Sequence, residues 1–297
     1  TWLTFPAYVS IFSLLIYFIG YKLRAGQLEL NELHIIDVLP GQKEIMRGRS
    51  YASIYSPIND DYQLGGKFAQ GAIRSEYGGA FQGNMASSLR VRHTPGQLEA
   101  SARVRIWTSR LLYSEWLASD SGSITATLTK NNADSYELSV ANQLNKAITG
   151  AVLIAEGKVT ELELQSPPGS RRVLSIHTAP SPHTGEKLGS ISRNGRFQNA
   201  VNVRNQAFGD TEGGRIEPEL MNLVASSFPA LLESNNPVAS FNGSGGIDLS
   251  AHAERGGAVL FLLAEDHAPI PSTGLFETKL SQSRTLYRIP LETTETD

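Results

Sequence analysis

Cysteine is absent from the chain, which excludes disulfide scaffolds, thiolate zinc sites and cysteine nucleophiles. The sequence also has no excess of positive charge, because 26 Lys and Arg residues stand against 29 Asp and Glu residues, for a net charge of −3. We therefore expect no general attraction to nucleic acid, and no nucleic-acid-binding motif is present. Of the 297 residues, 40% are apolar, which is enough to build one large or two medium domains with a buried core.

Motifs for nucleotide binding and for a serine nucleophile are absent as well. The chain contains no G-x-x-x-x-G-K-[ST] loop, and no G-x-G-x-x-G follows an expected strand into a helix. Residues 242–246 (NGSGG) come nearest to a nucleophile elbow, but the apolar strand before them and the helix after them are missing. Residues 59–61 (NDD) lack the spacing of an EF-hand loop, so we expect a plain turn there.

Two groups of histidines and carboxylates are the candidates for a metal site. Their spacing matches neither a helical H-x-x-x-H pair nor a zinc finger, so a solvated loop or strand face is the favoured interpretation. The sequence therefore predicts no catalytic residue, no metal ligand and no cofactor. The two groups are His177, His183 and Glu186, and separately His252, Glu254, Asp266 and His267.

The chain begins with a long apolar segment. Residues 1–21 contain no charged side chain, and Lys22 and Arg24 end the run. As a helix, about 20 residues rise roughly 30 Å, which matches the hydrocarbon core of a bilayer. We expect residues 1–24 to form a transmembrane helix that contacts lipid through residues 2–21. The alternatives fit less well, because a buried helix seldom stays apolar on every face and a signal peptide needs a basic start and a cleavage site.

Beyond residue 28 the apolar residues recur with a period of two, which predicts β-strands. Turn signals separate the expected strands by roughly ten to twenty residues, as is typical of an antiparallel β-sandwich. The expected strands cover residues 33–38, 50–55, 89–92, 102–107, 123–128, 135–142, 151–156, 172–177, 258–264 and 284–291, with one short helix near residues 217–232. The side chains expected to be buried on facing sheets are Val104, Ile106, Leu138, Val140, Val152 and Ile154.

Composition also suggests where domains begin and end. Residues 28–177 are expected to form an immunoglobulin-like β-sandwich, although the Cys…Trp…Cys set of antibody domains is missing. Residues 65–88 and 178–214 are rich in glycine and polar residues, so poorly packed, flexible loops are expected there. Residues 215–297 would supply the short helix and the last strands, packed on the sandwich. Within them, residues 258–264 (AVLFLLA) predict a central strand covered on both faces.

A run of arginines is the feature that most suggests a ligand. On a strand over residues 102–107, alternation would put Arg103, Arg105 and Trp107 on one face. Arginine over tryptophan makes a cation–π pair or a rim for an anionic glycan, whereas a solvated strand face is the simpler interpretation. The whole basic run consists of Arg90, Arg92, Arg103, Arg105 and Arg110.

Three stretches of the sequence together carry a family resemblance. They are TFPAYVSIFSLLIYFIGYKLRAGQLELNELHIIDV with RGRSYASIYSP, then VRIWTSRLLYSEW with the run from ITATLTKNN to SPPGSRRV, and GAVLFLLAEDHAPIP with RTLYRIPL. In this order they resemble a group of uncharacterised bacterial envelope proteins. The resemblance implies a transmembrane helix that carries a β-rich domain outside the cytoplasm, and it implies no catalytic residue.

These features favour a non-enzymatic, membrane-anchored envelope protein. Its extracytoplasmic β-domain would bind, space or assemble with other envelope proteins or glycans. The alternative is an envelope hydrolase acting on glycan or ester substrates, which needs acidic side chains that converge in a cleft. Lys22 and Arg24 favour a cytoplasmic location for the part of the chain after the helix. The resemblance instead favours a helix in the cytoplasmic membrane with the domain outside the cytoplasm.

Overall fold

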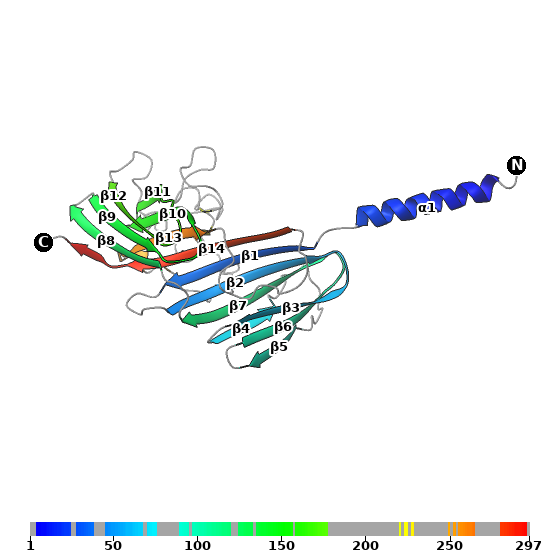
Figure 1. The fold of residues 1–297 in the computed structure, drawn as a ribbon, viewed down its shortest axis with the longest axis horizontal. Helices are drawn as coiled ribbons and strands as arrows, with labels where there is room; N and C mark the ends of the chain where they lie inside the picture. Colours follow the sequence, from blue (N-terminus) through cyan, green and yellow to red (C-terminus); the bar gives the residue numbers. More distant parts are fainter. Residues whose placement is uncertain are drawn as a thin grey trace, which may run out of the picture. The chain divides into compact units, whose positions relative to one another are not determined.

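The computed structural model shows a mainly β protein with one long helix and several antiparallel sheets (Figure 1). It divides into two compact units, each built from separate stretches of the chain. Unit 1 comprises Thr1–Glu32, Ser50–Ser114 and Ile270–Gln282, and unit 2 comprises Leu33–Arg49, Glu115–Pro269 and Ser283–Asp297. The structure describes residues 4–24, 28–38, 45–67, 70–75, 89–94, 97–119, 124–132, 135–156, 158–177, 255–264 and 280–295, together with 220, 223, 224, 227, 228, 249, 252 and 253.

The N-terminal segment is a continuous helix, α1 (Thr4–Arg24), of 21 residues. The expected helix is therefore confirmed, and the large apolar side chains between Phe5 and Phe18 are each 49% to 75% exposed. By length and hydropathy, no helix within the described part of the chain qualifies as a membrane span. The transmembrane assignment made from the sequence is thus not supported by that criterion.

Unit 1 contains two sheets around one core. The first sheet has the order β1-β2-β7-β4, and β1, β2 and β7 contribute to it only the parts that belong to unit 1. The second sheet has the order β3-β6-β5. Leu30, Ile54 and Leu112 of the first sheet pack with Leu64 and Val104 of the second in a shared apolar cluster. The bounds are β1 (Glu29–Val38), β2 (Ile45–Ser56), β3 (Asp60–Lys67), β4 (Gln70–Ser75), β5 (Leu89–Thr94), β6 (Gln97–Val104) and β7 (Thr108–Ser119).

Unit 2 is built on a larger sheet with the order β11-β10-β13-β14-β1-β2-β7, to which the last four strands contribute only the parts that belong to this unit. A second sheet has the order β12-β9-β8-β15, in which β15 pairs with β8 in parallel and the other neighbours are antiparallel. The bounds are β8 (Ile124–Asn132), β9 (Ser135–Asn142), β10 (Ile148–Ala155), β11 (Lys158–Leu162), β12 (Ser170–His177), β13 (Ala258–Ala264), β14 (Leu280–Leu291) and β15 (Thr293–Glu295).

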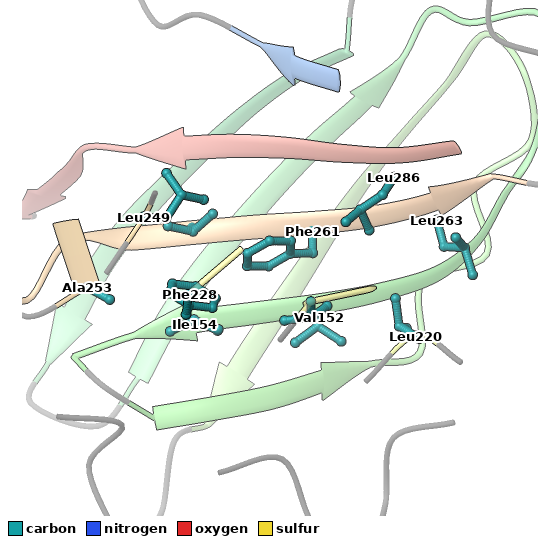
Figure 2. Close-up of a cluster of buried hydrophobic side chains, with 11 residues drawn as sticks. Val152, Ile154, Leu220, Phe228, Leu249, Ala253, Phe261, Leu263 and Leu286 are labelled. Carbon is teal, nitrogen blue, oxygen red and sulfur yellow. The ribbon is translucent and has the colours of Figure 1, made fainter. Parts of the chain in front are cut away.

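The strand β13 lies in the interior of the larger sheet, between β10 and β14, and every one of its residues is buried. Figure 2 shows one of its faces, where Phe261 lies beside Val152 of β10 and Leu286 of β14. Leu220 and Phe228 cover this face, and the rings of Phe228 and Phe261 meet edge to face at 5.7 Å. The expected central strand, covered on both faces, is therefore confirmed.

Parts of the expected short helix near residues 217–232 are also described. Leu220, Leu223 and Val224 are helical, and Ser227 lies in a turn. Leu220 and Val224 are buried in the cluster with Val152 and Ile154, which explains the apolar spacing of that segment. The expected loop 178–214 lies outside the described residues.

Five of the six side chains expected in one core are buried, although Val104 belongs to unit 1 and the others to unit 2. Leu138, Val140, Val152, Ile154 and Val104 are all buried, whereas Ile106 is 42% exposed. The reason is that β6 ends at Val104 and the chain turns there, so the expected strand 102–107 is wrong in its second half. A second correction concerns residues 65–88, where β3 extends to Lys67 and β4 occupies Gln70–Ser75 in place of an expected loop.

Candidate interaction site

The predicted metal groups are only partly within the described residues. His252 is described, and its Nε2 lies 3.1 Å from the carbonyl oxygen of Ala258. A Cβ placed on Gly257 would come within 2.4 Å of that nitrogen, so the imidazole packs directly against the backbone. Among the described residues, no three His, Asp or Glu side chains gather as they would around a metal ion. The other candidate side chains lie outside the part of the chain that the structure describes, and so do residues 242–246. These candidates are His177, His183, Glu186, Glu254, Asp266 and His267.

The predicted basic run separates into three environments. Arg90 and Arg92 are exposed on β5, and Arg103 is exposed on β6. Arg105 lies beyond the end of β6, in a turn. Arg110 is buried, and its Nη1 donates to the carbonyl oxygen of Arg103 at 2.9 Å. Burial lowers the pKa of the Arg110 guanidinium. The five arginines are thus not one surface, and Arg105 and Trp107 do not share a strand face with Arg103.

The register shows which arginines do share a face. Arg90 pairs with Ser101 and Arg92 with Glu99, and Arg103 is opposite Asp61 on the other side of β6. Since paired residues point to the same face of a sheet, positive and negative side chains alternate there. This mixed charge agrees with the simpler interpretation, a solvated strand face.

A tight turn follows β6 and contains a strained tryptophan. Thr108 donates its N–H to the carbonyl oxygen of Arg105 at 3.2 Å, and its hydroxyl donates to the same oxygen at 2.8 Å. Trp107, in the third position of this turn, has a φ of 58°. Turns with a positive φ at the third position favour Gly or Asn, because a Cβ costs roughly 1–2 kcal/mol in the left-handed region. The structure therefore keeps a bulky residue where a small one would be favoured.

A second turn lies against the first and connects β2 to β3. The Ser56 hydroxyl donates to the carbonyl oxygen of Ile58 at 2.6 Å and lies 2.6 Å from the hydroxyl of Tyr62. Because the single proton of Ser56 goes to Ile58, the buried Tyr62 hydroxyl is the donor to Ser56. Asn59 Oδ1 accepts an N–H from the neighbouring turn. The plain turn expected for residues 59–61 is wrong in its second part, because β3 begins at Asp60 and includes Asp61.

Two hydrogen bonds hold these turns together. The N–H of Trp107 donates to the carbonyl oxygen of Ser56 at 2.7 Å, and the N–H of Ile106 donates to Asn59 Oδ1 at 2.8 Å. Three large apolar side chains are nevertheless exposed on them: Ile58 at 54%, Ile106 at 42% and Trp107 at 46%. We call Ile58, Ile106 and Trp107 the apolar corner, since both turns carry the chain from one sheet of unit 1 to the other.

Outside α1, the apolar side chains on these two fixed turns form the strongest candidate for a contact site in the described residues. Exposed apolar residues that stand alone are ordinary, whereas a group of them marks a contact with another surface. Backbone strain also collects at functional sites, where surrounding contacts hold an unfavourable conformation in place. Sequence reasoning missed the corner because its two turns are separated by strands β3 to β6. The usable signals were Pro57 and Asn59, which favour turns.

Unit 2 contains a cluster of charged and aromatic side chains formed by Lys130, Glu156 and Tyr136. Lys130 Nζ lies 2.5 Å from Glu156 Oε1 and 5.7 Å from the ring centre of Tyr136. The hydrogen bond with Glu156 raises the pKa of Lys130, and burial raises the pKa of Tyr136. Glu156 lies between Ala155 and Lys158, which pair where β10 reverses into β11, and it has a φ of 51°. Glu156 thus lies in the tight connection between these two strands.

Comparisons with known proteins identify no family for this chain. No family model matches it, and no curated protein matches it either. Among solved structures it is similar to the Fcho1 Mu homology domain of Danio rerio with bound Eps15 peptide, at a TM-score of 0.39 and 7% identity over 90% of this chain and 97% of that one. Similarity at this level supports no conclusion about function, and the resemblance to envelope proteins stays a prediction.

Proposed function

We propose that the chain is a non-enzymatic protein attached to the cytoplasmic membrane of a bacterium through α1, with its β units outside the cytoplasm. The β units would serve as a module that binds, spaces or assembles other envelope proteins or glycans. The observation that carries the proposal is the exposure of α1. Its large apolar side chains from Phe5 to Phe18 are exposed around the helix, with no charged residue before Lys22.

The arrangement of these side chains favours lipid over a protein partner. Leu14, Leu15 and Ile16 are consecutive, so on an α-helix with 3.6 residues per turn they point in directions about 100° apart. A protein surface covers one stripe of a helix, whereas lipid surrounds it completely. Transfer of each such side chain out of water is worth about 1.5–3 kcal/mol, so together they supply a large driving force for membrane binding.

The non-enzymatic part of the proposal is supported by how acidic side chains are used. Asp37 is paired with Arg288, and Glu115 with Arg49. Each of these carboxylates is held by a cation in unit 2 and contributes to joining strands. A hydrolase of the alternative kind would need two carboxylates directed at a common substrate. The carboxylates of Asp37 and Glu115 are each engaged by an arginine, so neither is directed at a substrate of that kind.

The test uses the full chain and a charge placed on α1. Leu15→Arg is expected to move the protein from the membrane fraction to the soluble fraction, because an arginine near mid-segment costs about 2.5–3.5 kcal/mol on insertion scales. Val173→Arg is the matched control, since Val173 is an apolar residue 56% exposed on β12 and should tolerate the charge. Removal of residues 1–24 should abolish membrane association. Unchanged membrane association of either variant of the helix would show that the proposal is wrong.

A further inference from the structure

The topology of unit 1 shows at which end of the sheet the chain enters from α1. The strands β1 and β2 are neighbours, and only residues 39–44 connect them. A parallel pair needs a crossover of about a dozen residues or more, so this pair is antiparallel. Glu29 at the start of β1 therefore lies at the same end of the sheet as Ser56 at the end of β2 (Figure 1).

The apolar corner is built at this same end. Ser56 accepts the N–H of Trp107, and the turn that contains Ile58 follows Ser56 directly. Only residues 25–28 stand between Arg24 of α1 and Glu29, and such a segment reaches at most about 18 Å when extended. If α1 holds the chain at a bilayer, the corner is therefore tethered within a short distance of that bilayer.

The chemistry of the corner fits the interface between water and lipid. Tryptophan is enriched at the headgroup level of membranes because its ring is large and apolar while its N–H remains polar. Two isoleucines add apolar area next to it. Charges nearby are balanced, with Arg103 and Arg105 against Asp60 and Asp61. Contact with lipid would therefore depend on apolar burial more than on anionic headgroups.

We propose that the apolar corner, Ile58, Ile106 and Trp107, inserts into the headgroup region of the same bilayer that α1 engages, and that it fixes how unit 1 lies on the membrane. This inference rests on the attachment proposed for α1. The hydrogen bonds of Ser56, Asn59 and Thr108 hold both turns before contact, so little ordering is needed on binding. Trp107 is 46% exposed and keeps a positive φ where Gly would suit the backbone, as expected for a residue retained for an external contact.

The experiment places one probe on the corner of the full chain, reconstituted into phosphatidylcholine vesicles. Because the chain has no cysteine, Ile58→Cys gives a single site for an environment-sensitive dye. Val173→Cys, on exposed β12 of unit 2, is the matched control. The dye at position 58 should be protected from aqueous iodide and quenched by lipids brominated near the headgroup. The dye at position 173 should remain open to iodide, and added salt or anionic lipid should change neither result much.

Each other outcome has a definite meaning. Membrane-bound protein whose position 58 is as open to iodide as position 173 would overturn the lipid contact and leave the function of α1 intact. Protection from iodide without quenching by brominated lipid would mean that protein covers the corner, which also overturns the proposal. Protein that does not join the vesicles at all would refute the proposed attachment, and the inference with it.

The variant Trp107→Gly separates contact from packing. Glycine accepts a φ of 58° without a Cβ clash, so the unfolding midpoint should stay the same or rise. Quenching of the dye at position 58 by brominated lipid should fall at the same time. A clear drop in the unfolding midpoint would show that Trp107 is retained for packing within unit 1, and the proposal would be wrong.

Discussion

The buried side chain of Asn142 joins three backbone segments of unit 2. Its Nδ2 donates to the carbonyl oxygens of Lys146 and Ser166, each at 2.9 Å, and its Oδ1 accepts the N–H of Leu144 at 3.0 Å. A single amide thus pairs backbone groups at the end of β9, where regular strand pairing stops. Asparagine suits this place because it offers donors and an acceptor on a short side chain.

Ile154 provides the residue-scale test of the core. Its side chain is completely buried on β10, in the cluster with Phe228 and Phe261. Ile154→Ala is expected to lower the free energy of unfolding by about 2–5 kcal/mol, because the substitution removes apolar contacts and leaves a cavity. Val173→Ala, on an exposed position of β12, should change it by less than about 0.5 kcal/mol. Denaturant unfolding of both variants measures the difference, and equal values would contradict the assigned burial.

At the scale of elements, a buried ion pair connects two strands that are far apart in the sequence. Arg288 of β14 donates from Nε to Asp37 Oδ1 of β1 at 2.6 Å, and both side chains are buried. Arg288 is directly opposite Phe261 in the β13–β14 register, so its charge lies beside apolar neighbours. Such a pair specifies which strand lies next to which, because any other neighbour would leave a buried charge unpaired.

The prediction for this pair compares single and double substitution. Asp37→Ala should lower the free energy of unfolding by about 3–5 kcal/mol, since it leaves Arg288 buried without its carboxylate. The double variant Asp37→Leu with Arg288→Met should lose much less, because both charges are removed together. Lys130→Ala, which breaks a more exposed pair with Glu156, is expected to have little effect and is the control. A single variant as stable as the double one would show that the pair is not coupled.

At the scale of the whole molecule, the chain order and the sheet order differ. The strand β13 lies between β10 and β14, although about a hundred residues separate it from β10 in the sequence. β10 therefore obtains one of its two strand neighbours from the C-terminal third of the chain. The strands β1, β2, β7 and β14 each contribute residues to both units.

This interleaving predicts the outcome of truncation. A fragment of residues 28–177 retains the expected sandwich range but loses β13 and β14, so Val152 and Ile154 would lose their apolar partners. Each such side chain contributes about 1.5–3 kcal/mol by burial. We expect the fragment to show no cooperative unfolding transition, whereas residues 28–297 should unfold cooperatively. Cooperative unfolding of the shorter fragment would instead support residues 28–177 as an independent domain.

The sequence by itself determined the features that depend on local pattern. The bounds of β9 and β13 were predicted to the residue, because alternation and an unbroken apolar run are strong signals. The helical state of α1 followed in the same way from a long segment without charge. These features are recoverable since the residues that stabilise each element lie within it or on its own faces.

Only the tertiary structure decided the features that depend on distant segments. Alternation predicted that the strand through Val104 would continue to Trp107, but Ser56 and Asn59 bind the backbone of the following residues and a turn forms. The neighbours of β10 and the apolar corner likewise require segments that meet only after folding. Pairing energies between such segments do not appear in a local pattern, because a strand's alternation specifies which face is buried and leaves open which partner buries it.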